Sequence, residues 1–200
     1  MFELLSNEIV VYLATRMLLD CENARVYFYS VEVLLMNLVL LLTIIGVTIA
    51  GSCPLLLLGY IIFYIPIRIF AGGYHAKNSD RCYVLSVLLY VLLACIYNIV
   101  PNLYASDKAV ITCVISIIGI AVAAPHTNEN HELSREQYLR NKKIVLGILL
   151  GNGVAFAILY LLKCRLASSI VIYMATCFIM IWVDLIRLKL KAIVASWEEY

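Results

Sequence analysis

Long apolar runs alternate with short polar segments along almost the whole chain, and this pattern restricts the fold more than any other feature. An α-helix rises 1.5 Å per residue, so roughly 20 apolar residues cross a ~30 Å hydrocarbon layer. Hydrophobic residues make up 64% of the 200 and charged residues only 14%, which is more apolar surface than one soluble core could bury. We therefore predict an all-α integral membrane protein, with one membrane domain over residues 1–200 and about six transmembrane helices. These helices are expected at 33–51, 54–70, 83–100, 109–124, 144–162 and 168–187.

We interpret residues 1–30 as an amphipathic N-terminal segment ahead of the first predicted span. Apolar side chains recur at helical spacing over 7–20, with charged residues elsewhere around the helix and Asn7 placed to cap its N-terminus. We expect this helix either to lie in the membrane interface or to pack on the rest of the protein. The first residues lack a basic stretch and a small-residue cleavage site, so we expect no cleaved signal peptide.

Lysine and arginine residues are distributed unevenly between the two ends of the predicted helices. With the N-terminus in the cytoplasm, the cytoplasmic segments hold twelve of them and the outer loops hold three. Because basic residues collect on the cytoplasmic side, we expect a multi-pass protein with both termini in the cytoplasm. Segment 71–82 then lies on the same side, where cysteines stay reduced. The basic ends also suit contact with anionic membrane lipids.

Segment 71–82, between the second and third predicted spans, holds a histidine and a cysteine seven residues apart, His75 and Cys82. A cysteine is a nucleophile as its thiolate, and an adjacent imidazole with positive charge nearby favours that form. Lys77 and Arg81 supply the charge. In one continuous helix the two side chains would lie about 10 Å apart along the axis, which is too far for proton transfer. The segment must therefore bend for the imidazole to reach the thiol.

Residues that favour such a bend lie on both sides of the histidine. Gly72 and Gly73 permit backbone conformations that are closed to other residues. Asn78, Ser79 and Asp80 favour turns and helix N-termini, so we expect one of them to cap the third span, with the cysteine in its first turn. Asn78 or Asp80 could also orient the imidazole as a third member of the site.

Two simpler interpretations compete with catalysis. The histidine and the cysteine could be incidental loop residues, or they could join His126 and His131 in a metal site. The spacing of these residues matches no zinc pattern, so we expect no metal and no cofactor, and we interpret His126 and His131 as solvated loop residues. A net charge of +2 gives no reason to expect a nucleic-acid partner.

Two features of the last predicted spans indicate helix contacts. Gly147 and Gly151 are spaced for the close approach of two helices, either within the chain or across a homodimer. Asp184 lies near the cytoplasmic end of the sixth predicted span, where it should pair with Arg187 or lie in the interface.

The run Pro-Ile-Arg-Ile-Phe-Ala-Gly-Gly-Tyr-His-Ala-Lys, from Pro66 to Lys77 and followed by Cys82, resembles the signature of the accessory gene regulator B (AgrB) family. This family comprises membrane-embedded cysteine endopeptidases of Gram-positive quorum sensing. The resemblance implies a protein of the bacterial plasma membrane that removes the C-terminal tail of an AgrD-type precursor peptide and holds the remainder as a thioester. A thiol or hydroxyl within the peptide would then attack the thioester and release a cyclic thiolactone or lactone.

The resemblance also implies roles for individual residues. Cys82 would be the nucleophile, and His75 would be the general base that takes the thiol proton and the acid that protonates the leaving amine. Arg68 and Gly73 match positions of the motif that support activity.

A basic run, Arg135, Arg140, Lys142 and Lys143, begins before the fifth predicted span. As a membrane anchor it would contact anionic lipid. As a substrate-binding element it would hold the acidic C-terminal region that is typical of AgrD-type precursors. The two roles are compatible with each other.

A small peptide transporter or exporter is the main alternative to an enzyme. Such a protein should carry ionisable groups near the bilayer midplane, whereas the deep parts of the predicted spans hold almost none. A non-catalytic membrane scaffold is a second alternative, but it gives no reason for a glycine pair, a histidine and a cysteine in one short segment.

Overall fold

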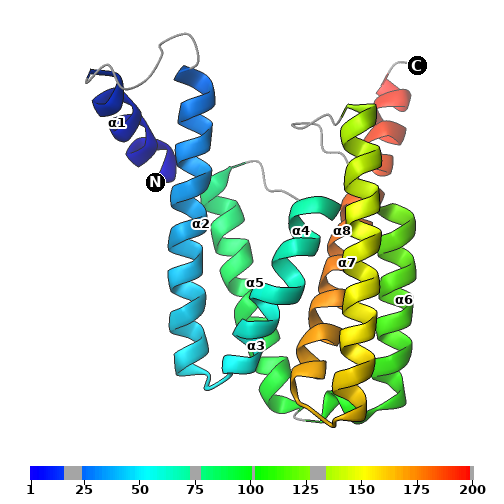
Figure 1. The fold of residues 1–200 in the computed structure, drawn as a ribbon. Helices are drawn as coiled ribbons and strands as arrows, with labels where there is room; N and C mark the ends of the chain where they lie inside the picture. The colour runs from blue at the N-terminus through cyan, green and yellow to red at the C-terminus, as the bar shows by residue number, and fades with distance from the viewer. Residues whose placement is uncertain (16–23, 73–77, 101, 127–133, 199–200) are drawn as a thin grey trace. The chain divides into compact units, whose positions relative to one another are not determined.

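The computed structural model describes residues 1–15, 24–72, 78–100, 102–126 and 134–198, and all regular secondary structure in these ranges is helical (Figure 1). In chain order the elements are α1 (Phe2–Thr15), α2 (Ala24–Ala50), α3 (Pro54–Gly59), the π-helix η2 (Tyr60–Tyr64), α4 (Ile65–Ala71), α5 (Ser79–Ile99), the 3-10 helix η3 (Leu103–Ala105), α6 (Asp107–Ala123), α7 (Arg135–Leu161) and α8 (Leu166–Glu198).

Five stretches of helix in the described part of the chain are long and apolar enough to cross a membrane. The predicted span 109–124 corresponds to α6, whose 17 residues make about 26 Å of helix, short for a full crossing. The prediction of an all-α membrane protein is therefore confirmed. The five stretches are Val26–Ala50, Pro54–Ala71, Ser79–Ile99, Arg135–Leu161 and Leu166–Lys191.

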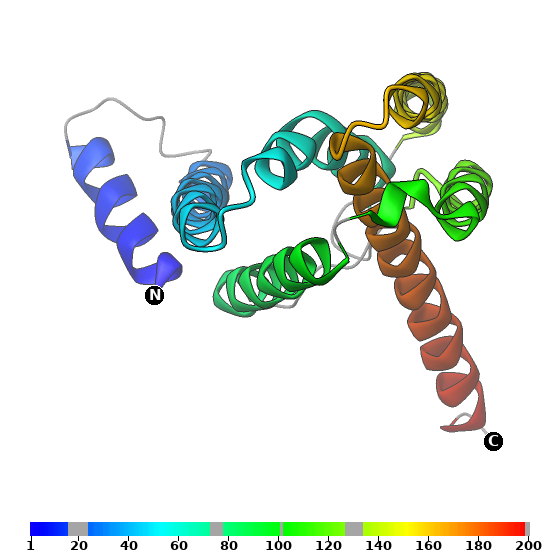
Figure 2. The same cartoon turned by 90° about the horizontal axis from the view of Figure 1, so that it is seen from below.

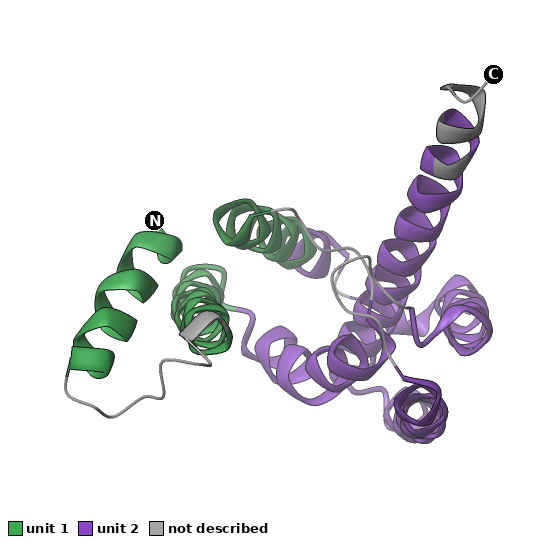
Figure 3. Cartoon of the chain, turned by 90° about the horizontal axis from the view of Figure 1, so that it is seen from above, with its two compact units in different colours: residues 1–52, 75–95 green, residues 53–74, 96–200 purple. Residues whose placement is uncertain are grey.

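The chain forms two compact units, coloured green and purple in Figure 3. Unit 1 comprises Met1–Ser52 and His75–Cys95, and unit 2 comprises Cys53–Tyr74 and Ile96–Tyr200. Unit 1 therefore contains α1, α2 and most of α5, and unit 2 contains the remaining helices.

In unit 1, α1 packs against α2 through a single face. Its buried residues, Phe2, Ser6 and Val10, recur every four positions and so lie on one side of the helix. Of the two predicted arrangements for this segment, packing on the protein is thus observed. The prediction that Asn7 caps the helix is wrong, because α1 already begins at Phe2. The ring of Phe2 is buried and meets Tyr83 edge-on with the centroids 5.7 Å apart, which favours helical backbone from this residue onward.

Two hydroxyl pairs connect α2 and α5 within unit 1. Thr43 Oγ1 lies 2.9 Å from the hydroxyl of Tyr83, and Thr48 Oγ1 lies 2.7 Å from the hydroxyl of Tyr90. The two tyrosines are seven residues apart, about two turns, and so share one face of α5. Hydrogen bonds in an apolar environment are costly to lose, so these pairs fix α5 on α2.

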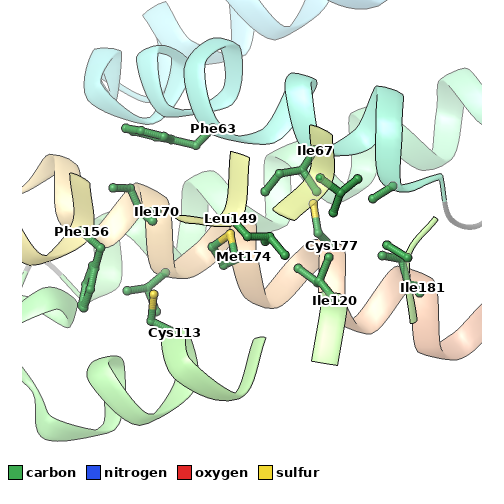
Figure 4. Packing of buried hydrophobic residues seen from close by; sticks show 14 of the residues in the cluster. Phe63, Ile67, Cys113, Ile120, Leu149, Phe156, Ile170, Met174, Cys177 and Ile181 are labelled. Carbon is green, nitrogen blue, oxygen red and sulfur yellow. The ribbon is translucent and has the colours of Figure 1, made fainter. Parts of the chain in front are cut away.

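In unit 2, α8 is the most buried of the five membrane stretches. It packs against α3, η2, α6 and α7, and Figure 2 shows it running obliquely past α6 and α7, which are seen nearly end-on. Apolar side chains from these helices and from α4 form the core of the unit (Figure 4). The residues labelled there are Phe63, Ile67, Cys113, Ile120, Leu149, Phe156, Ile170, Met174, Cys177 and Ile181.

The membrane stretch that ends at the predicted site is interrupted by the π-helical segment Tyr60–Tyr64. Just before it, the backbone of α3 lies directly on α8, since a Cβ on Gly59 would stand 2.5 Å from the Cβ of Ser169. The hydroxyl of Tyr173 on α8 donates to the carbonyl of Leu56 at 3.1 Å. A π segment takes up one more residue per turn than an α-helix, so the residues that follow it face other directions than they would if the whole stretch were α-helical.

Candidate functional site

Cys82 lies in the first turn of α5. The helix starts at Ser79, and the N–H of Cys82 donates to the carbonyl of Asn78 at 3.0 Å. Asn78 therefore occupies the N-cap position, whose carbonyl accepts the first hydrogen bond of the helix. The thiol of Cys82 is free and its residue is half-buried. A thiol here lies at the positive end of the helix dipole.

Asp80, in the same turn of α5, contacts the first two residues of the chain at the start of α1. Its Oδ2 lies 2.7 Å from the backbone amine of Met1, and its Oδ1 accepts a hydrogen bond from the N–H of Phe2 at 3.3 Å. Both members of the ion pair are more than half exposed, so water screens their attraction and the pair adds little stability. The carboxylate instead gives the first N–H of α1 an acceptor and registers that helix against the first turn of α5.

Two predicted site residues, His75 and Gly73, lie outside the described residues, within 73–77. The bend that would bring the imidazole to the thiol, and the orienting role suggested for Asn78 or Asp80, therefore stay predictions. His131 also lies outside the described residues.

Arg68 and Gly72 meet at the C-terminal end of α4, in unit 2. Arg68 Nη1 donates to the carbonyl of Gly72 at 2.8 Å and so caps the last turn of α4. Gly72 has a φ of +76°, a conformation that side chains disfavour. A Cβ on Gly72 would also stand 2.5 Å from the carbonyl oxygen of His126, whose N–H donates to the carbonyl of Ala71 at 2.8 Å.

The side chain of His126 is buried, so its interpretation as a solvated loop residue is wrong. Its Nε2 lies 2.9 Å from Oδ2 of Asp184 on α8, and the two side chains are only 6% and 2% exposed. Oδ1 of Asp184 lies 3.7 Å from Arg187 Nη1, which confirms the predicted pairing of that aspartate with Arg187. The sequence indicated that Asp184 needs a further partner, because its carboxylate lies inside an apolar run, where a buried charge must be paired. No spacing rule connects it with a histidine 58 residues earlier.

The four residues of the basic run differ in their surroundings. Lys142 Nζ donates to the carbonyl of Ala124 at 2.6 Å and also to that of Ala121, so it caps the C-terminal end of α6. The other three side chains, Arg135, Arg140 and Lys143, are exposed on the first turns of α7. Only these three are presented to a substrate or to lipid along their full length.

Four of the other described cysteines have environments unsuited to a nucleophile. Cys113 and Cys177 are buried in the core of unit 2, and Cys95 lies on an exposed face of a membrane stretch, near its C-terminal end. Burial raises the pKa of the Cys53 thiol even though the nearby Arg165 guanidinium lowers it. Within the described ranges, no three histidine, cysteine, aspartate or glutamate side chains come together as metal ligands.

Comparison with known proteins identifies the family. The model of the accessory gene regulator B family matches residues 6–186. Accessory gene regulator protein B of Staphylococcus saprophyticus is 36% identical over 81 residues, which cover 39% of this chain and 40% of that protein. The chain thus matches less than half of the length of this relative, and no solved structure matches it. Because the family match extends over most of its length, the chain belongs to the accessory gene regulator B family.

Proposed function

We propose that this protein is a membrane-embedded cysteine endopeptidase that processes the AgrD-type propeptide of its quorum-sensing system. The observation that supports this best is the position of Cys82, a free thiol in the first turn of α5, directly after the segment that contains His75. Family membership supports the place of the reaction in quorum sensing.

In the proposed reaction, His75 removes the proton from the thiol of Cys82, and Sγ attacks the carbonyl carbon that precedes the C-terminal tail of the propeptide. The first N–H groups of α5 have no acceptor inside the helix, so they suit the negative charge that develops on the carbonyl oxygen. The C–N bond then breaks, and His75 returns its proton to the leaving amine. The rest of the peptide stays on Cys82 as a thioester.

A thiol or hydroxyl within the bound peptide next attacks the thioester carbonyl. The new bond closes a thiolactone or lactone, and Sγ of Cys82 leaves with the electron pair. His75 takes the proton of the attacking group and passes it to Sγ. Exchange of a thioester for a thiolactone changes the free energy little, so holding the peptide and excluding water decide the outcome. A site at the membrane surface would limit hydrolysis of the intermediate.

We further propose that the protein is a multi-pass protein of the bacterial plasma membrane with this site on the cytoplasmic side, which the excess of basic residues in the predicted cytoplasmic segments supports. The exposed side chains of Arg135, Arg140 and Lys143 support a second role, in which they hold the acidic tail of the precursor and contact anionic lipid.

The test is intact-mass spectrometry of the purified protein mixed with its candidate precursor. We expect a thioester adduct on Cys82, together with the released tail. Cys82→Ala should bind the precursor but form no adduct and release no tail, and Cys82→Ser should be nearly inactive. Cys95→Ala is the matched control, because this thiol lies exposed on the same helix.

Three outcomes would contradict the proposal. An adduct on a different cysteine would show that Cys82 is not the nucleophile. Processing of the precursor without any adduct would contradict the thioester intermediate. The Cys82→Ala variant tests the two alternatives. If it still exported the peptide at the wild-type rate, the transporter alternative would hold, and if it still supported assembly of the system, the scaffold alternative would hold.

A further inference from the structure

The backbone turn that follows α4 is held in three ways within unit 2. The N–H of His126 donates to the carbonyl of Ala71, and Arg68 donates to the carbonyl of Gly72, each at 2.8 Å. The carbonyl oxygen of His126 also occupies the space that a side chain on Gly72 would need. The start of the connection between α6 and α7 therefore lies directly against the end of α4.

The imidazole of His126 anchors this connection to α8. A carboxylate only accepts hydrogen bonds, so in the contact of 2.9 Å the Nε2–H group of His126 donates a hydrogen bond to Oδ2 of Asp184. A carboxylate that is 2% exposed is costly without partners, and Arg187 provides the second one at 3.7 Å. Removal of the imidazole would take one partner from the buried carboxylate of Asp184, so the contact between His126 and Asp184 is strongly favoured.

The same connection is held from α7 as well. Lys142 Nζ donates to the carbonyls of Ala121 and Ala124, so residues 124–126 are fixed by a cation from α7 and a carboxylate from α8. The end of α4 is hydrogen-bonded to a support that two other helices hold in place.

We propose that His126 and Asp184 are positioning residues for the segment that contains His75. Neither side chain can reach a substrate, because both are almost completely buried. They act through the backbone of Ala71 and Gly72, from which the chain proceeds to His75 three residues later. Within unit 2 these contacts hold the point at which the chain leaves α4, and this should limit the directions in which the segment toward His75 can start and so lower the entropy cost of forming the site. The inference rests on the proposed function, in which His75 is the general base.

The test compares His126→Leu, Asp184→Leu and His126→Gln by two measurements on the purified full-length protein. The first is kcat and KM for precursor cleavage. The second is the rate of tryptic cleavage after Lys77, which reports on the same segment without catalysis. We expect the two leucine variants to lose about 10- to 100-fold in kcat with little change in KM, and to be cut faster after Lys77. The glutamine variant can still donate to the carboxylate, so it should stay close to wild type in both measurements.

Thr176→Val is the matched control, since Thr176 is buried on the same helix and its hydroxyl donates to the carbonyl of Ile172 in its own helix. It should leave both measurements unchanged. The double variant with leucine at both 126 and 184 should be no worse than the poorer single variant, because the two residues act as one unit.

The inference is overturned if both leucine variants keep the wild-type kcat and the wild-type rate of cleavage after Lys77. It is also overturned if His126→Gln loses as much kcat as His126→Leu, because the glutamine keeps an N–H donor for Asp184 and should preserve the activity. Failure of the proposed function looks different: the wild-type protein would form no thioester, while the tryptic measurement would still report on the role of the His126–Asp184 pair.

Discussion

Gly72 must lack a side chain for two reasons that are independent of each other. Its backbone, with φ +76° and ψ −147°, lies near a region that is almost exclusive to glycine. The atom that a Cβ would meet at 2.5 Å is a backbone carbonyl oxygen, that of His126, which cannot rotate away as a side chain could. The motif glycine therefore has a structural role at the end of α4 that needs no catalytic explanation.

Gly72→Ala should destabilise the protein by about 1–3 kcal/mol and slow precursor cleavage, because the hydrogen bond between His126 and Ala71 would have to give way. Thermal unfolding and the cleavage rate measure the two effects. Gly46→Ala is the control, since a Cβ at that position of α2 meets no atom within 4 Å. A Gly72→Ala variant that unfolds and cleaves like the wild type would contradict this reasoning.

Among the helices, glycine marks close contacts at positions that the sequence pattern did not indicate. A Cβ on Gly147 or Gly151 meets no atom within 4 Å among the described residues, so these show no contact within the chain at this pair, and the homodimer alternative stays a prediction. The close contacts lie at Gly59 of α3 and at Gly119 of α6, where a Cβ would overlap the ring of Phe178 on α8. Single glycines of this kind have no spacing that could be recognised in a sequence.

The homodimer alternative predicts that Gly151→Leu lowers the dimer fraction, because a large side chain would separate two copies of α7 that approach at this face. Native mass spectrometry or crosslinking in detergent measures that fraction. Leu146→Phe, exposed on a different face of the same helix, should leave it unchanged. A wild-type protein that is monomeric under these conditions would contradict the homodimer prediction directly.

Hydropathy located the membrane helices because a backbone in hydrocarbon must satisfy its own hydrogen bonds, which leaves few alternatives to a helix. It did not locate their ends. α7 begins at Arg135, ahead of the predicted span 144–162, because Ser134 and Gln137 exchange the hydrogen bonds of a capping box. That pattern is present in the sequence and could have been used. The π segment has no comparable signal, since tyrosine, isoleucine and phenylalanine fit an α-helix equally well.

At the scale of the whole molecule, the site predicted from one short segment depends on residues far away in the chain. Cys82 was placed correctly in the first turn of a helix, and Asn78 is one of the three residues expected to cap it, because capping chemistry is local. The pairing of His126 with Asp184 connects positions 58 residues apart, so only the fold brings them together. Lys142 shows the same limit, because its charge indicated a surface role while its ammonium group caps α6.

The distribution of charge over the molecule leads to a prediction about the substrate. Replacement of Arg135, Arg140 and Lys143 by glutamine should raise KM several-fold for a precursor with an acidic tail but not for one with a neutralised tail, because only the first loses an electrostatic attraction. Cleavage assays at low and high salt would measure this difference, which should shrink as salt screens the charges. Lys142 is left unchanged in this variant because of its structural contacts.

Lys189→Gln is the control, since Lys189 is an exposed basic residue near the end of α8. Equal losses with the acidic and the neutralised precursor would leave the basic run with a role in lipid anchoring alone.

The π segment Tyr60–Tyr64 links the winding of one membrane helix to the geometry at its C-terminal end, where Arg68 and Gly72 lie. Each helical residue turns the chain by about 100°. If the same residues were wound as an ordinary α-helix, the span would still fit the bilayer, but Arg68 and Gly72 would be rotated away from the support that His126 provides. A substitution that removes the π turn without changing the hydropathy of the span should therefore leave membrane insertion intact and impair the proposed peptide processing.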